Sequence, residues 1–239
     1  MSDAGTLFRR MDRPWSEAGL AATLETLAQV HNFSHAAVFT IPSSDDAGAE
    51  MRPILTNWNE EFRAGFERSG LSRYSLVMKA LRADPLPLVW DLETLYGHDP
   101  QDADAIAPQA RILVRSGCRS GAYLPVHGLT SFNGVLWLAG DRDPPQEEET
   151  ADLHQAAFLA FGILAAIRFE ENKRNNPLSA RERDCLKLAM LGKTSSEIGT
   201  ILALSEYTVS QYLASATRKV NASNRTHAVA LAAQLGYLS

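Results

Sequence analysis

The carboxy-terminal part of the chain contains unusually well-marked helix starts. Ser179 stands three residues before Glu182, and Thr194 stands three residues before Glu197. In each pair the hydroxyl and the carboxylate can satisfy backbone N–H groups that lack a partner at a helix start, an arrangement called a capping box. Gly192 lies between the pairs, where a helix ends readily in a left-handed residue. Helices at this spacing predict a helix–turn–helix module, because the major groove of DNA admits one helix that a second helix holds in place.

A third helix in this segment is expected to carry the DNA-reading surface. Ser205 caps it, and the helix runs from residue 206 to about residue 220. Apolar residues recur at helical spacing and predict its buried face: Val209, Leu213, Ala216 and Val220. The outward face then presents Ser210, Gln211, Ala214 and Arg218. Gln211 can make two hydrogen bonds to one adenine, and Ser210 can bond to several bases.

Residues 178–239 resemble the four-helix DNA-binding domain of the LuxR family of transcription regulators. The matching positions are spread over the whole segment and keep their spacing: Leu178, Ser179, Arg181, Glu182, Leu186, Gly192, Lys193, Glu197, Ile198, Leu202, Ser205, Thr208, Val209, Leu213, Lys219, Asn224, Arg225, Ala228 and Ala230. An alternative interpretation is a small helical bundle that only docks other proteins.

The resemblance implies which residues bind DNA. These are Lys193, Thr194, Ser195, Ser205, Thr208, Ser210, Gln211, Ala214, Arg218, Lys219 and Arg225. In the family, the positions that match Ser210, Gln211 and Ala214 meet base edges. Arg218 and Lys219 are expected to bind phosphate, as are the backbone N–H groups at the start of the second helix.

The charge of the chain is unevenly divided. Residues 178–239 hold seven Lys and Arg against four acidic residues, a net charge of +3, whereas the remaining residues carry a net charge of −8. A polyanion is therefore attracted to the carboxy-terminal segment and repelled by the rest.

The first 170 residues mix candidate strands with candidate helices. Strands are expected over 34–41, 53–57, 86–91, 121–127 and 133–140, and helices over 17–30, 59–67, 75–82, 103–115 and 150–169. Strands grouped between helices predict an α-β-α sandwich around an antiparallel sheet. The fold class is thus α/β plus all-α. We expect a sensor and dimerisation domain over residues 1–170, a polar linker over 171–177 and the DNA-binding domain over 178–239.

Residues of about 15–170 resemble, less specifically, the domain with which quorum-sensing members of the LuxR family enclose an acyl-homoserine lactone. The ligand-binding residues that this resemblance implies are Trp58, Phe62, Tyr74, Trp90, Gly121, Tyr123 and Trp137. The strongly apolar stretch 150–169 is expected to be buried in a domain core or in a dimer contact.

One family feature is missing from this segment. Family members place Asp-Pro about fifteen residues before the second Trp, and that Asp accepts a hydrogen bond from the ligand amide, but here Tyr74 and Ser75 stand in its place. A buried N–H without an acceptor costs about 1–3 kcal/mol. We therefore expect an altered pocket, which either binds a different apolar signal or is closed by its own side chains.

The function predicted is that of a DNA-binding transcription regulator in the cytoplasm. Candidate partners are double-stranded DNA, a second copy of the chain, RNA polymerase, and an acyl-homoserine lactone or another small apolar signal, with no cofactor, metal or membrane. A phosphorylation-controlled response regulator is disfavoured because, although Asp45 and Asp46 follow the first candidate strand, the regular strand and helix alternation and the late Lys of a receiver domain are absent from the sequence. Catalysis is disfavoured because there is no nucleophile elbow, phosphate loop or metal-spaced His/Cys cluster.

Overall fold

The computed structural model describes residues 4–41, 50–99, 105–127 and 133–238. The chain divides into two compact units, Met1–Ala165 and Ala166–Ser239. We call the first the sheet domain and the second the helical head. Each is described by itself.

The sheet domain is built on five antiparallel strands in the order β2-β1-β5-β4-β3. Their bounds are β1 His35–Thr40, β2 Arg52–Thr56, β3 Leu88–Asp91, β4 Ser120–His127 and β5 Asn133–Gly140. The two central neighbours β4 and β5 are buried almost throughout, and they pair from Ser120 with Gly140 to His127 with Asn133.

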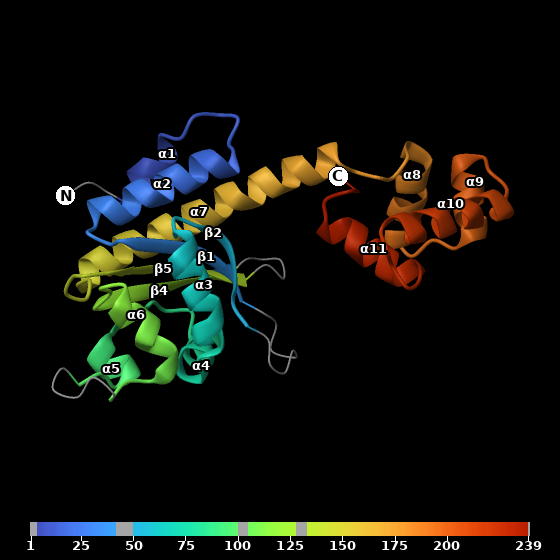
Figure 1. The fold of residues 1–239 in the computed structure, drawn as a ribbon. Helices are drawn as coiled ribbons and strands as arrows, with labels where there is room; N and C mark the ends of the chain where they lie inside the picture. Colours follow the sequence, from blue (N-terminus) through green and yellow to red (C-terminus); the bar gives the residue numbers. More distant parts are fainter. Residues whose placement is uncertain (1–3, 42–49, 100–104, 128–132, 239) are drawn as a thin grey trace. The chain divides into compact units, whose positions relative to one another are not determined.

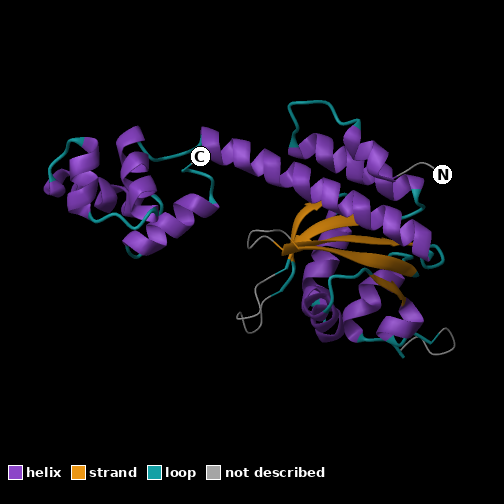
Figure 2. Cartoon of the chain, turned by 180° about the vertical axis from the view of Figure 1, so that it is seen from behind, coloured by secondary structure: helices purple, strands orange, loops and turns teal. Residues whose placement is uncertain are grey.

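Helices cover both faces of the sheet, which gives the α-β-α sandwich that the sequence predicts (Figures 1 and 2). One face carries α1 Ala4–Arg9, α2 Glu17–Val30 and α7 Glu147–Arg174. The other carries α3 Glu60–Ser69, α4 Ser75–Ala83, α5 Leu92–Tyr96 and α6 Arg111–Arg115, with short 3-10 turns at Leu71–Arg73 and Pro108–Ala110.

The expected helix over 103–115 is wrong in extent. Residues 103–104 lie outside the described residues, and the α-helix covers only Arg111–Arg115. Pro108 stands at the first position of a 3-10 turn that precedes it, where its missing N–H is tolerated. The short helices α1 and α5 were not predicted, because segments of five or six residues carry too little periodicity.

Helix α7 is longer than the sequence predicts at both ends. Residues 171–174, whose polar composition predicts a linker, form its last turn. Its apolar residues Leu153, Ala160 and Leu164 are buried, whereas Phe158 is half exposed. By length and composition α7 could cross a membrane, but the core helix of a soluble protein passes the same test. Its buried apolar face fits the latter.

After the end of α7, the described part of the helical head contains four helices, as predicted. Their bounds are α8 Ala180–Met190, α9 Ser195–Leu202, α10 Glu206–Lys219 and α11 Arg225–Gln234. Both capping boxes are confirmed, with Ser179 and Glu182 at α8 and with Thr194 and Glu197 at α9. Gly192 has φ +80°, so the predicted left-handed residue after α8 is also confirmed.

The turn between α9 and α10 is tight. Ala203 adopts a left-handed conformation (φ 56°), and the N–H of Leu204 donates to the carbonyl oxygen of Gly199 at 2.8 Å. A Cβ at Gly199 would lie 2.7 Å from the carbonyl oxygen of Leu204. A glycine is therefore needed where the two helices of the helix–turn–helix approach.

Candidate functional site

The residues predicted to bind a ligand gather in one core between the sheet and helices α3 to α6. They are Trp58, Phe62, Tyr74, Trp90, Gly121, Tyr123 and Trp137. Trp90, Tyr123 and Trp137 are at most 1% exposed, and Tyr74 packs at the margin. This aromatic core brings together side chains from α3, β3, β4 and β5.

Trp58 packs closely against the neighbouring rings of this core. Its ring centroid is 5.0 Å from that of Phe62, 4.7 Å from Phe66 and 5.7 Å from Trp137. Trp137 also stacks on Trp90, with the centroids 6.5 Å apart and the ring planes within 6°. Protein cores are close-packed, so a ligand that enters this core must separate rings from one another.

Gly121 makes room for Trp90. A Cβ on Gly121 would lie 2.0 Å from the carbonyl oxygen of Leu138 and 2.7 Å from the Trp90 ring. The indole therefore lies directly on the backbone of β4, and a residue larger than glycine cannot occupy this position without moving either the strand or the ring.

The tyrosine hydroxyls of the aromatic core have partners within it. The hydroxyls of Tyr96 and Tyr123 are 2.9 Å apart, and burial raises the pKa of both phenols. The hydroxyl of Tyr74 donates to the carbonyl oxygen of Leu95 at 3.4 Å. The three hydroxyls are thus already paired.

Three indole N–H groups in the same core lack a partner. The Nε1 atoms of Trp58, Trp90 and Trp137 are buried and have no hydrogen-bond acceptor among the described residues. An unpaired buried donor costs about 1–3 kcal/mol. The core therefore offers donors that a bound molecule with carbonyl oxygens can satisfy. Asp91, next to Trp90 in the chain, caps α5: its Oδ1 accepts from the N–H of Thr94 at 2.7 Å.

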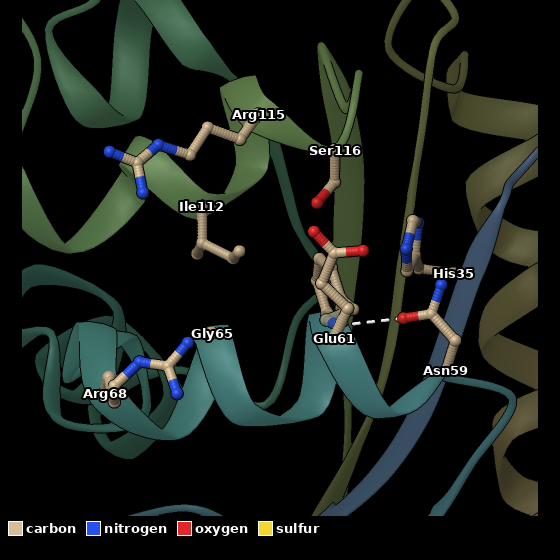
Figure 3. Close-up of a pocket in the computed structure, with 9 residues that line it drawn as sticks. His35, Asn59, Glu61, Gly65, Arg68, Ile112, Arg115 and Ser116 are labelled. Atoms are coloured by element: carbon tan, nitrogen blue, oxygen red, sulfur yellow. Dashed lines mark hydrogen bonds between the residues drawn. The ribbon is translucent and has the colours of Figure 1, made fainter.

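A polar cleft of about 330 Å³ lies between α3 and α6 (Figure 3). It is lined by His35, Asn59, Glu61, Phe62, Gly65, Arg68, Ile112, Arg115 and Ser116. Phe62 places the cleft beside the aromatic core. Its charged side chains suit water or a polar molecule better than an apolar signal.

In the helical head, α10 has one buried and one exposed face. Val209, Leu213 and Ala216 are buried, as predicted. At 3.6 residues per turn the opposite direction is occupied by Tyr207, Gln211, Ala214 and Arg218, and all four are exposed. We call these four residues the reading face.

A groove of about 420 Å³ runs beside the reading face. It is lined by Ser195, Ser210, Leu213, Ala214, Thr217, Arg218 and Arg225. Five of the predicted DNA-binding residues thus meet in one groove, at the amino-terminal end of α9. Backbone N–H groups at a helix start favour an anion such as a DNA phosphate.

Lys219, predicted to bind phosphate, is already paired inside the head. Its Nζ lies 2.8 Å from Oε2 of Glu182, a residue only 3% exposed. Glu182 also accepts from the hydroxyl of Ser215 at 2.7 Å and from the N–H of Ser179 at 2.6 Å. Burial alone would raise the pKa of Glu182, but these hydrogen bonds outweigh it and lower the pKa to about 2. The carboxylate ties α8 to α10.

Other predicted DNA-binding residues also hold the head together. Arg225 is half-buried and donates to the carbonyl oxygen of Lys193 at 2.5 Å. The hydroxyls of Ser205 and Thr194 cap α10 and α9, and Thr208 bonds to Ser205. Their side chains fix the positions of the helices, which leaves Gln211, Ala214 and Arg218 on the outward surface.

The structure adds residues that the sequence did not single out. Phe39, Phe66 and Tyr96 belong to the aromatic core, and Tyr207 belongs to the reading face. Phe66 lies four residues after Phe62, so helical spacing could have identified it. Tyr96 lies in the unpredicted helix α5 and had no such signal.

A helix–turn–helix head with an exposed polar face, in one chain with an α-β-α domain around an aromatic core, defines a class of two-domain transcription regulators. The comparisons with known families agree. Residues 16–168 match the family described as "Autoinducer binding domain", and residues 176–232 match "Bacterial regulatory proteins, luxR family". The chain belongs to the LuxR family and is a DNA-binding transcription regulator of the quorum-sensing type.

Individual relatives cover most of the chain. The transcriptional activator protein BjaR1 of Bradyrhizobium diazoefficiens is 29% identical over 195 residues, which are 80% of this chain and 78% of BjaR1. The quorum sensing-dependent regulator RpaR of Rhodopseudomonas palustris is 28% identical over 92% of this chain and 88% of its own. Among solved structures, Escherichia coli SdiA superposes with a TM-score of 0.64 over 99% of this chain and 98% of its own, at 18% identity, which shows a common fold.

Proposed function

We propose that the chain acts in the cytoplasm as a homodimeric regulator whose sheet domain binds a small apolar signal in the aromatic core. The autoinducer-binding match over residues 16–168 supports a signal, and the packed rings around Trp58 support its apolar character. A signal changes DNA binding only if it binds one state of the protein better than another. We therefore expect the signal and the operator each to strengthen the binding of the other.

The unpaired donors of the core favour a signal that accepts hydrogen bonds rather than one that donates them. The indole N–H groups of Trp58, Trp90 and Trp137 have no acceptor, and no acidic residue is buried in the sheet domain among the described residues. The amide N–H of an acyl-homoserine lactone would lack a carboxylate acceptor, at a cost of about 1–3 kcal/mol. We propose a carbonyl-bearing apolar molecule such as an ester, lactone or ketone. A structure of SdiA in complex with octanoyl-rac-glycerol, at 19% identity to this chain, provides an ester for the first experiment.

Tryptophan fluorescence tests this proposal. All four tryptophans lie in the sheet domain, so their emission follows its unfolding alone. A ligand at one hundred times its Kd raises the unfolding free energy by about 2.7 kcal/mol. We expect octanoylglycerol to raise the unfolding midpoint more than N-octanoyl-homoserine lactone, and Trp58→Phe, which removes a donor, to reduce the difference. A larger shift with the lactone would contradict the proposed ligand chemistry.

Ligand-independent regulation is the second candidate, and the ring packing favours it. The ring centroids of Phe62, Phe66 and Trp137 lie 4.7–5.7 Å from that of Trp58, and Tyr74 bonds to Leu95, which supports a core that its own side chains fill. An unchanged unfolding midpoint and unchanged operator affinity across a broad set of lipophilic esters, lactones and ketones would support this candidate.

The dimer proposal rests on an apolar groove of about 390 Å³ between α1 and α7. It is lined by Phe8, Arg9, Met11, Arg13, Trp15, Phe158, Leu159, Gly162 and Ile163. Phe158 is 50% exposed, which is unfavourable for a large apolar ring in water. We expect Phe158→Asp to sediment as a monomer at micromolar concentration and wild type to sediment as a dimer. Val114→Asp, at an exposed apolar position on α6, is the matched control.

The DNA proposal rests on the reading face. We propose that Gln211 contacts a base and that Arg218 contacts phosphate, with contact to RNA polymerase remaining a prediction from the family. Loss of a two-bond contact to adenine costs about 1–3 kcal/mol, or about 5- to 150-fold in affinity. Gln211→Ala should weaken binding to a selected duplex by that factor and leave binding to random duplex unchanged. Equal weakening on both duplexes would contradict base contact.

A further inference from the structure

Tyr207 is an exposed aromatic residue at the start of α10. Its exposed fraction is 73%, which is the largest among the exposed large apolar and aromatic side chains of the described residues. Its ring makes no aromatic contact or hydrogen bond with the residues that the structure describes. Neither the packing nor the capping of the helix accounts for an aromatic ring there.

The position of Tyr207 on α10 is specific. Gln211 follows it after four residues and Ala214 after seven, so the three side chains form one line along the centre of the reading face. The buried residues Val209 and Ala216 point in the opposite direction. Tyr207 therefore faces whatever Gln211 faces.

The reading face carries little charge. Lys219 lies to one side and is paired with Glu182. Arg218, at the far end of the line, forms no ion pair with described residues. Between Tyr207 and Ala214 the surface is an aromatic ring, an amide and a methyl group. Such a surface complements the major-groove edge of A·T pairs, where adenine offers a donor and an acceptor and thymine offers a methyl group.

We propose that Tyr207 is a specificity-determining residue, whose ring contacts the C5-methyl group of a thymine in the operator. This rests on the proposed reading of DNA by α10. Four residues of helix rise about 6 Å, and stacked bases are about 3.4 Å apart. The thymine that Tyr207 contacts therefore lies within about two base pairs of the adenine that Gln211 contacts.

The experiment uses the full chain and a library of random-sequence duplexes. The duplex that wild type selects is labelled, and affinities are measured by fluorescence anisotropy. Each thymine is then replaced singly by deoxyuridine, which removes the methyl group and leaves base pairing intact. The variants are Tyr207→Ala, Tyr207→Phe and, as an exposed apolar control on α9, Ile201→Ala.

We expect Tyr207→Ala to weaken binding about fivefold, which corresponds to roughly 1 kcal/mol. Tyr207→Phe keeps the ring and should bind within about twofold of wild type, as should Ile201→Ala. One deoxyuridine should weaken wild type but have no further effect on Tyr207→Ala, which identifies the contacted base.

Three outcomes would overturn the proposal. Wild type could tolerate deoxyuridine at every position, Tyr207→Ala could bind like wild type, or Tyr207→Phe could lose as much as Tyr207→Ala, which would assign the contact to the hydroxyl. Failure of wild type to select any sequence is a different result, because it would contradict DNA reading by α10 itself.

Discussion

The sheet domain and the helical head satisfy their polar groups in opposite ways. In the head, Glu182 is buried yet accepts hydrogen bonds from three partners, and both capping boxes are complete. In the sheet domain, the indole N–H groups of Trp58, Trp90 and Trp137 are buried without a partner among the described residues. A surface that reads DNA benefits from a fixed framework, whereas a pocket for a ligand gains from groups that only the ligand completes. The difference is consistent with a reader and a sensor in one chain.

The largest expected effect concerns the packing of the sensor. Gly121→Val should lower the unfolding free energy of the sheet domain by about 3 kcal/mol or more, because the new side chain meets the Leu138 carbonyl and the Trp90 ring. Tryptophan fluorescence during urea unfolding measures this. Gly162→Ala is the control, since nothing lies within 4 Å of a Cβ there and helix propensity favours Ala. Equal losses in both variants would show that Gly121 has no special packing role.

The second prediction compares two carboxylates at the same helix position. Glu182→Ala should destabilise the head by about 2–3 kcal/mol, because it leaves Ser215, Lys219 and the cap of α8 without their acceptor. Glu197→Ala removes the corresponding capping-box carboxylate of α9, which is exposed, and should lower the unfolding free energy of the head by only about 0.5–1 kcal/mol. Hydrogen exchange of amides in α8 to α10 measures both. A similar loss of protection in the two variants would contradict the role of burial.

The third prediction is the pH dependence of the head. The pKa of Glu182 is lowered from 4.5 to about 2 by its hydrogen bonds. A folded-state pKa below the unfolded value means that the stabilisation is fully present above about pH 5 and is lost as the pH falls towards 2. The unfolding free energy of the head should therefore decrease over this range in wild type and decrease less in Glu182→Gln. Parallel pH profiles would exclude Glu182 as the responsible group.

The smallest effect is a stabilisation. Ala203 has φ 56°, a left-handed conformation that strains a residue with a Cβ and suits glycine. Ala203→Gly should raise the unfolding free energy of the head by about 0.5–1 kcal/mol, after the added flexibility of the unfolded chain is subtracted. The hydrogen-exchange measurement described for Glu182 detects it. A loss of stability would show that the turn tolerates Ala without strain.

The two domains also differ in how much of them could be predicted from sequence. In the head, Ser179, Thr194, Ser205 and Gly192 determine helix starts and ends through hydrogen bonds within a few residues, so local pattern gave the correct helices. In the sheet domain, Gly121 and Trp90 pair across neighbouring strands although they lie 31 positions apart in the chain. The sequence marked both as candidate ligand-binding residues but could not show that they pack against each other.

The sequence could not predict which side chains pair with one another in the folded head. From sequence, Lys219 was predicted to bind phosphate, as basic residues of DNA-reading helices often do. In the structure it pairs with Glu182, which lies 37 positions away in the chain and could not be recognised as its partner from local pattern. Arg225 likewise reaches the carbonyl oxygen of Lys193, 32 positions away. Which cation remains available to a ligand depends on these tertiary contacts and not on residue type.

The pairing of Lys219 with Glu182 should make the binding of DNA less sensitive to salt concentration. Each phosphate that a protein neutralises releases condensed counterions, so the logarithm of the association constant falls by about 0.9 per contact with the logarithm of salt concentration. A lysine already neutralised by its own fold releases none. The affinity of this regulator for its operator should accordingly fall less steeply with salt concentration than it would if Lys219 contacted a phosphate.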